Sequence, residues 1–93
     1  MIVRYTEGAK EDLEKSFGWY EAQRRGLGFD FLDCIESSIM KIFISPELYS
    51  VIYLNFRRCV IRRFPFSIFF TIENNEIIIH SVFDNRRNPE KRP

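Results

Sequence analysis

Two apolar runs near the end of the chain constrain its fold more than any other feature of the sequence. Residues 66–72 and 77–83 are rich in isoleucine and phenylalanine, and Glu73-Asn74-Asn75-Glu76 separates them. Asparagine tolerates positive φ, so Asn74-Asn75 suits the two-residue turn of a β-hairpin. A hairpin this apolar must be buried on at least one face, so the rest of the chain has to supply its cover.

A two-residue turn also fixes the register of the hairpin, because neighbouring residues of a strand point to opposite faces. The pairs expected on the covered face are Ile72–Ile77, Phe70–Ile79, Ile68–Ser81 and Phe66–Phe83. On the other face, this register places His80, the single histidine of the sequence, opposite Phe69. A histidine in the middle of a strand is more often a half-buried, hydrogen-bonded side chain than a catalytic base.

The first half of the chain predicts a strand followed by two helices. Residues 2–5 are β-branched or aromatic, and Thr6 suits a helix N-cap. Apolar residues at helical spacing then predict one helix that ends near Arg25, where a Gly-Leu-Gly follows, and a second helix from about Phe29 to Ile44. So short a connection makes the two helices an antiparallel pair.

From residue 51 the pattern becomes strand-like until Phe64-Pro65 interrupts it, since proline cannot donate to a central ladder. Alternation along this strand places Arg58, Val60 and Arg62 on one face. The sequence therefore predicts an α+β fold of order β-α-α-β-β-β, in which two antiparallel helices pack on one face of an antiparallel sheet. We expect one domain over residues 1–93, with 89–93 as a flexible tail.

Charge is divided unevenly between the two halves of the chain. Residues 1–50 carry a net charge of −3, and residues 51–93 carry +4. Arginine doublets occur at 57–58, 62–63 and 86–87, and a guanidinium offers a planar set of donors that fits phosphates and carboxylates. The basic half is therefore expected to face an anionic partner.

Cys34 and Cys59 have neither CxxC spacing nor a neighbouring histidine. We expect both to be reduced thiols of a cytoplasmic protein, and we expect no metal site and no cofactor. The sequence has no apolar run of 18 residues and no long apolar stretch at its start. Neither a transmembrane segment nor a signal peptide is therefore expected.

Five local motifs, in this order and spacing, resemble the RelE/ParE toxin superfamily. They are Trp19-Tyr20, Gly26-Leu27-Gly28-Phe29, Ser45-Pro46 through Tyr49, Arg62-Arg63-Phe64-Pro65-Phe66, and Val82 through Pro89. The resemblance extends over nearly the whole chain. It implies the toxin of a type II toxin–antitoxin system (a plasmid-stabilisation toxin), neutralised by an antitoxin protein encoded in the neighbouring gene.

The resemblance leaves three functions open, because fold alone does not determine function. ParE-like members bind DNA gyrase and poison it without being hydrolases. RelE-like members enter the ribosome and cleave mRNA in its A site as metal-independent endoribonucleases. A degenerate toxin would only bind its antitoxin and act in control of the operon.

The residues favour the gyrase-directed function over RNA cleavage. Cleavage needs a base and an acid as well as cations, and RelE-like nucleases commonly carry a Tyr or His near the C-terminus, where residues 88–93 have neither. Many relatives have a His where this chain has Asp84, which we expect to pair with the neighbouring arginines. The weak catalytic candidates that remain are His80, Tyr49, Arg62 and Arg86.

The sequence also predicts two sets of binding residues, one for the target and one for the antitoxin. The residues expected to bind the target are Arg58, Arg62, Arg63, Asp84, Arg86 and Arg87. Aromatic and aliphatic side chains beyond what two helices can bury are expected to form an exposed patch that the antitoxin covers. These residues are Trp19, Phe31, Leu54 and Phe56. For Trp19 the sequence allows a second position, in the groove between the two helices.

Overall fold

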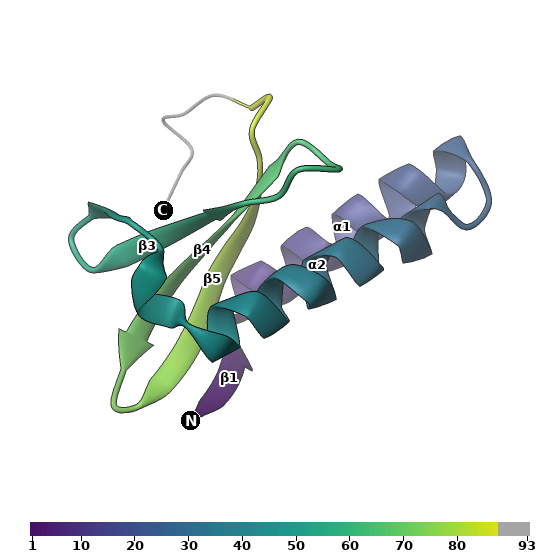
Figure 1. The fold of residues 1–93 in the computed structure, drawn as a ribbon. Coiled ribbons are helices and arrows are strands. Elements are labelled where there is room, and N and C mark those ends of the chain that lie inside the picture. The colour runs from purple at the N-terminus through teal and green to yellow at the C-terminus, as the bar shows by residue number, and fades with distance from the viewer. Residues whose placement is uncertain (88–93) are drawn as a thin grey trace.

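A pair of helices lies across one face of a five-stranded sheet (Figure 1). The computed structural model describes residues 1–87, so the predicted flexible tail lies outside the described residues. Along the chain the elements are β1 (Ile2–Tyr5), α1 (Glu7–Gln23), α2 (Leu27–Ile44), the 3-10 turn η1 (Pro46–Leu48), β2 (Val51–Tyr53), β3 (Phe56–Val60), β4 (Phe66–Glu73) and β5 (Glu76–Asp84). The predicted α+β class and the order of its main elements are confirmed.

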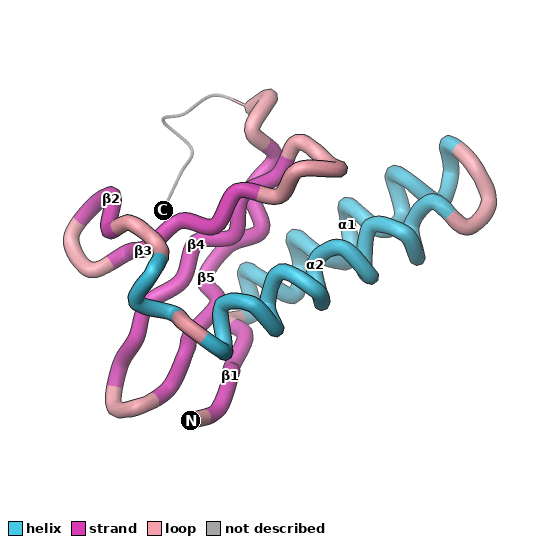
Figure 2. The backbone as a smooth tube through the Cα atoms, in the orientation of Figure 1, coloured by secondary structure: helices cyan, strands magenta, loops and turns pink. Residues whose placement is uncertain are grey.

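The sheet differs from the predicted antiparallel arrangement in two ways. Its strand order is β1-β5-β4-β3-β2 (Figure 2). Strand β1 runs parallel to β5, so the sheet is mixed. The residue pattern of a four-residue strand carries no information about its direction, which only the pairing with β5 determines. The second difference is β2, a three-residue edge strand that turns into β3 through Leu54 at φ +51°.

The connection between the helices is as short as predicted, but it lies two residues earlier in the chain. Helix α1 ends at Gln23 rather than near Arg25, and α2 already begins at Leu27. Gly26 makes this possible, because its φ of +88° lies in the left-handed region that glycine tolerates. The Glu21 carboxylate accepts hydrogen bonds from the Gly26 N–H and from the Gly28 N–H, each at 3.0 Å. A side chain of α1 therefore caps backbone N–H groups at the start of α2.

The β4–β5 hairpin has the predicted turn, with Asn74 at φ +51° and Asn75 at φ +61°. The pairs nearest the turn, Ile72–Ile77 and Phe70–Ile79, form as predicted. A β-bulge at His80 then shifts the register by one residue, which makes the remaining predicted pairs wrong. The observed pairs are Phe69–Ser81, Ile68–Val82, Ser67–Phe83 and Phe66–Asp84. The shift buries Val82 on the helix side in place of the Ser81 hydroxyl, so the apolar pattern decides the register.

Strand β5 extends beyond β1, and the start of α1 covers the edge that remains. Thr6 is the N-cap of α1, as predicted. Its N–H donates to the Ile79 carbonyl at 3.0 Å, and its hydroxyl donates to the carbonyl of the bulged His80 at 3.2 Å. Farther along α1, the Asp12 carboxylate accepts the Val82 N–H at 3.0 Å. These bonds fix α1 against β5 and satisfy backbone groups that an edge strand would otherwise expose.

Phe31 of α2 lies at the centre of the core between the helices and the sheet. Its side chain is fully buried, and its ring centroid is 5.0 Å from that of Phe66, 5.5 Å from that of Phe64 and 5.3 Å from that of Tyr20. The prediction that Phe31 belongs to an exposed patch is therefore wrong. The helical period places Phe31 with Ile35 on the inward face of α2.

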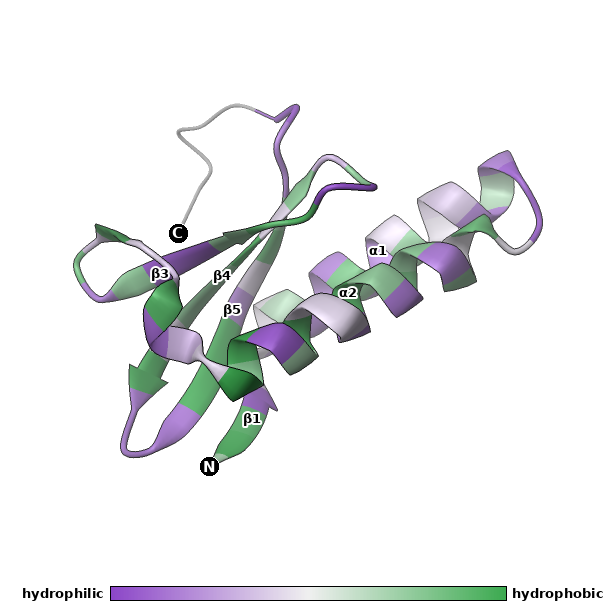
Figure 3. Cartoon of the chain, in the orientation of Figure 1, coloured by the Kyte–Doolittle hydropathy of each residue, from purple (hydrophilic) through white to green (hydrophobic). Residues whose placement is uncertain are grey.

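The hydropathy of the residues agrees with the packing of the two helices on one face of the sheet (Figure 3). Strand β4 is buried over almost its whole length and on both faces, since Ser67, Phe69 and Thr71 point away from the helices and are still inaccessible. The helices combine an apolar side with a polar one. Among the described residues, neither helix is long and apolar enough to cross a membrane.

Candidate functional site

The turn after β5 holds its arginines in a fixed arrangement. The Asp84 carboxylate accepts hydrogen bonds from Nε of Arg86 at 3.0 Å and from Nη2 at 2.8 Å, and it also accepts the Arg86 backbone N–H at 2.9 Å. The Arg87 N–H donates to the Asp84 carbonyl at 3.0 Å, and the Asn85 N–H donates to the Pro65 carbonyl at 2.7 Å. The predicted pairing of Asp84 with a neighbouring arginine is confirmed, and the turn is fastened to the sheet.

Asp84 also sets the electrostatics of this turn. Hydrogen bonds from Arg86 hold the pKa of the Asp84 carboxyl below its ordinary value, against the opposing effect of burial, and the charge of Arg87 lowers it further. Asp84 is therefore ionised at neutral pH. Together with Arg86 and Arg87 it leaves a net charge of about +1 on the turn.

A groove of about 260 Å³ runs between α1 and the end of β5. We call it the α1–β5 groove, and it is lined by Asp12, Lys15, Ser16, Trp19, Phe66, Val82, Asp84, Arg86 and Arg87. Asp12, Ser16 and Trp19 are spaced i, i+4 and i+7, so α1 presents them on one face. From this spacing, Asp12 and Ser16 could have been predicted to lie beside Trp19 at the site. Trp19 is 56% exposed, so an indole face lies open beside the arginines.

Tyr20 lies under the turn, although no local pattern in the sequence connects it with Arg86. Its hydroxyl is buried and makes no hydrogen bond of standard geometry within residues 1–87. Burial raises the pKa of Tyr20, the nearby Arg86 guanidinium opposes this shift, and the Asp84 charge adds to it. The phenol therefore stays protonated at neutral pH, with its hydroxyl close to the Arg86 guanidinium and its ring packed against Phe64 and Phe66.

Arg58 is tied to the same turn on the face of the sheet that points away from the helices. Its Nε donates to the Ser67 hydroxyl at 3.1 Å, and this hydroxyl donates to Oδ1 of Asn85 at 2.8 Å. Ser67 is fully buried. The chain of hydrogen bonds joins β3, β4 and the turn after β5, and it holds Arg58 in one orientation.

Arg62 and Arg63 lie in the loop between β3 and β4, because β3 ends at Val60 and not at Arg63 as predicted. An ion pair of 3.2 Å with Asp30 of α2 draws Arg63 toward the helices. Arg62 is exposed, and no residue among 1–87 pairs with its side chain. This loop contacts the turn after β5 through the Pro65 carbonyl, so the arginines gather at one end of the sheet. We call this region the basic end of the sheet, and it comprises Arg58, Arg62, Arg63, Arg86 and Arg87.

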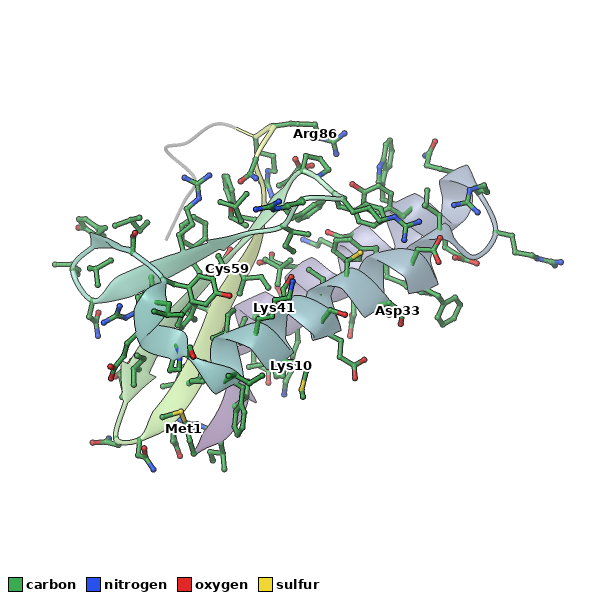
Figure 4. The ribbon with its side chains drawn as sticks, viewed as in Figure 1. Met1, Lys10, Asp33, Lys41, Cys59 and Arg86 are labelled. Carbon is green, nitrogen blue, oxygen red and sulfur yellow. The ribbon has the colours of Figure 1, made fainter. Side chains whose placement is uncertain are left out.

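A second groove, of about 580 Å³, lies between α2 and the edge of β3. We call it the α2–β3 groove, and it is lined by Asp33, Cys34, Ser37, Ser38, Lys41, Tyr49, Cys59, Val60, Ile61, Arg62 and Arg63. Figure 4 shows Lys41 on α2 and Cys59 on β3, and Arg86 beyond the end of β5. Both cysteines are free thiols, and burial raises the pKa of Cys59. The basic end thus borders two grooves, with one arginine doublet in each.

His80 is held in a polar cluster by Thr71 and Glu73. The Thr71 hydroxyl donates to the Glu73 carboxylate at 2.6 Å, so His80 Nε2, which is 2.9 Å from the same hydroxyl, acts as a donor to it. Burial lowers the pKa of His80, against the opposing charge of Glu73. His80 is four residues from Asp84 along β5, or about 13 Å. The neutral imidazole is therefore remote from the turn after β5, and its Nε2 proton is donated to the Thr71 hydroxyl.

Tyr49 lies on the opposite face of the sheet from His80. Its ring packs edge-on against Phe70, with centroids 5.8 Å apart, and its hydroxyl lies against the Cys59 thiol. Burial raises the pKa of Tyr49. Tyr49 shares the α2–β3 groove with Arg62, but His80 and Arg86 lie elsewhere. The structure therefore does not bring the four catalytic candidates together.

The residues expected to form the antitoxin-covered patch also separate. Trp19 is exposed in the α1–β5 groove, and Leu54 is 74% exposed at the β2–β3 turn. Phe56 is half-buried, with its ring 4.9 Å from that of His80, and Phe31 is in the core. Only Trp19 and Leu54 of this set are fully available at the surface of the described chain. Within residues 1–87, no three His, Cys, Asp or Glu side chains are grouped so that they could hold a metal ion.

The model of the ParE toxin of the type II toxin–antitoxin system parDE matches residues 3–89 of this sequence. The chain belongs to the ParE toxin family. The match includes the Trp19 face of α1, both arginine doublets of the basic end and the turn after β5. No curated protein matches the ParE-family chain significantly by sequence.

Two solved structures show that the fold is that of the RelE/ParE superfamily. The chain is similar to the chromosomal ParDE toxin–antitoxin system from P. aeruginosa, with a TM-score of 0.79 and 19% identity, over 90% of this chain and 95% of that one. It is also similar to the isolated E. coli RelE toxin, with a TM-score of 0.70 and 13% identity, over 96% of this chain and 88% of that one. At these identities the likeness concerns the fold.

Proposed function

We propose that this ParE-family protein arrests growth by binding DNA gyrase through the basic end of the sheet and the α1–β5 groove. The observation that carries the proposal is the composition of this groove, in which three cations and an exposed indole meet. Its two carboxylates are engaged, Asp12 with the Val82 N–H and Asp84 with Arg86. Such a surface suits binding of a partner that is anionic and partly apolar.

The α1–β5 groove is poorly suited to proton transfer. A general base works best when its pKa lies near the working pH, whereas Arg86 holds the pKa of Asp84 low. Neither His80 nor Tyr49 lines the groove, and residues 88–93 include no Tyr or His. These features support a toxin that acts by binding.

The second candidate is ribosome-dependent cleavage of mRNA. It is favoured by the α2–β3 groove, where the Tyr49 hydroxyl and Arg62 line the same space. Burial raises the pKa of Tyr49 there, so the phenol stays protonated at neutral pH but gives up its proton less readily, and no histidine lies in the groove to act as the base. A third candidate, a degenerate toxin that only binds its antitoxin, would show complex formation without growth arrest.

Expression of the chain alone in cells distinguishes these functions. We expect DNA breaks and stalled gyrase, with intact mRNA, and we expect the His80→Ala and Tyr49→Phe variants to arrest growth as the native chain does. Mapping of mRNA ends and of gyrase–DNA complexes in the same cultures measures both outcomes. Discrete cuts in A-site codons that disappear in either variant would show that the RelE-like function is the correct one.

The neutralising partner in this proposal is a cognate antitoxin encoded beside the gene. The outer face of α2, which the sheet does not cover, exposes large apolar side chains. They are Phe29, Met40, Phe43 and Ile44. An amphipathic segment of the antitoxin can cover such a face. Co-purification from the native operon tests this partnership, and a chain that is soluble, monomeric and harmless alone would remove the reason for it.

A further inference from the structure

The indole of Trp19 is the one accessible aromatic surface in the lining of the α1–β5 groove. Trp19 is 56% exposed, and within residues 1–87 its indole takes part in no hydrogen bond and no ring contact. The large apolar residues that share the lining, Phe66 and Val82, are each only 3% exposed and offer almost no surface. The groove therefore presents an open, flat π face, and not a deep apolar pocket that an anchoring side chain of a protein could fill.

Cations lie beside this indole in the same groove. Lys15 precedes Trp19 by four residues, so α1 presents both on one face, about 6 Å apart along its axis. Arg86 is held in place by its ion pair with Asp84, and Arg87 follows it in the turn after β5. Neither Lys15 nor Arg87 makes an ion pair within residues 1–87. These two side chains are therefore available to an anion next to the indole.

An open aromatic face beside cations is typical of sites for unpaired nucleotides. The base stacks on the aromatic ring, and the cations hold the backbone phosphates. Stacking needs a base whose face is free, and the bases inside a duplex are already stacked on their neighbours. The groove of about 260 Å³ is smaller than the pockets of about 300–1,000 Å³ that enclose a whole ligand. It therefore suits a single base whose backbone stays outside.

We propose that the α1–β5 groove binds an unpaired nucleotide of the DNA that gyrase holds, with the base stacked on Trp19 and a neighbouring phosphate against Lys15 and Arg87. The inference rests on the proposed gyrase-directed function, and it assigns this groove to the DNA of the gyrase–DNA complex. The strand ends that form when gyrase cleaves DNA carry bases with one free face. A toxin that holds such a base would delay resealing of the break.

Trp19 is the single tryptophan of the sequence, so its fluorescence reports on the groove directly. The purified chain is titrated with an eight-nucleotide oligothymidylate, and we expect quenching as a base stacks on the indole. The same strand in a duplex should quench far less. Lys15→Ala/Arg87→Ala should make the slope of log affinity against log salt shallower by about 1.4, since each phosphate contact contributes about 0.7. The control Lys10→Ala/Arg25→Ala removes the same charge from exposed residues outside the groove and should leave the slope unchanged.

Substitutions of the aromatic ring test stacking apart from charge. Binding of a fluorescein-labelled oligothymidylate is measured by anisotropy. Trp19→Ala should lower the affinity at least about fivefold, and Trp19→Phe, which restores a π face, should recover most of the loss. Phe29→Ala removes a ring of similar exposure from α2 and should leave the affinity unchanged. Thermal unfolding checks that each variant is folded.

Photochemical crosslinking locates the nucleotide in the complex with gyrase. With 5-iododeoxyuridine beside the gyrase cleavage site, we expect a crosslink to the peptide that contains Trp19, and we expect Trp19→Ala to accumulate less cleaved DNA than the native chain. Undiminished gyrase poisoning by Trp19→Ala, without this crosslink, overturns the inference and leaves the proposed function intact. Absence of quenching by the oligothymidylate also overturns it. Tighter binding of the matching RNA strand, with gyrase unaffected, overturns both the inference and the proposed function.

Discussion

Replacing Arg86 and Arg87 by alanine is expected to abolish growth arrest and to leave the protein folded. The two side chains are the cations that the turn after β5 presents in the α1–β5 groove. The Arg86 side chain is 58% exposed, so its ion pair with Asp84 contributes at most about 1 kcal/mol to stability. That corresponds to a shift in melting temperature of no more than about 8 °C. Growth after induction and thermal unfolding followed by circular dichroism measure the two effects.

An arginine doublet elsewhere on the surface provides the matched control. Arg24 and Arg25 are exposed at the end of α1, and Arg24 also has a carboxylate partner, Asp30. Arg24→Ala/Arg25→Ala removes the same charge and should arrest growth as the native chain does. If the Arg86→Ala/Arg87→Ala variant is instead unfolded, the doublet is structural, and its assignment to target binding is wrong.

Phe31→Ala is expected to have the largest effect on stability. Truncation of a fully buried phenylalanine costs about 3–5 kcal/mol, out of about 5–15 kcal/mol for a typical domain. The aromatic neighbours Tyr20, Phe64 and Phe66 would line the resulting cavity. A fall in melting temperature of more than about 12 °C is expected, and thermal unfolding of the purified variant measures it.

Phe29→Ala is the control for this prediction, because Phe29 is 58% exposed on the same helix. Its ring touches that of Phe17 with centroids 4.9 Å apart, so a loss of less than about 1 kcal/mol is expected. A Phe31→Ala variant that melts like the native chain but fails to bind the antitoxin would contradict the placement of Phe31 in the core.

Local patterns in the sequence predicted the helices and strands well. Prediction failed for strand pairings between residues that are far apart in the sequence. Thr6 as N-cap and the turn at Asn74-Asn75 depend on neighbouring residues, so both could be inferred. The bulge at His80 could not, because it arises where β1 ends and Thr6 takes the His80 carbonyl. The direction of β1 is likewise set by a partner strand far away in the sequence.

The same distinction applies to the site. The Asp84–Arg86 pair joins residues two positions apart, so its formation could be inferred from their closeness in the sequence. The division of the arginines between two grooves could not, since it depends on the contact of Arg63 with Asp30 and on the fixed turn at Asn85. Phe31 was misplaced for a related reason: exposure of an aromatic residue depends on which helix face the sheet covers.

Incubation of the purified toxin with DNA gyrase, relaxed plasmid and ATP tests the central claim most directly. The proposed function predicts loss of supercoiling and accumulation of gyrase-linked cleaved DNA with the native chain and with Arg24→Ala/Arg25→Ala, but not with Arg86→Ala/Arg87→Ala. Normal supercoiling at toxin concentrations that cleave mRNA on translating ribosomes would contradict it.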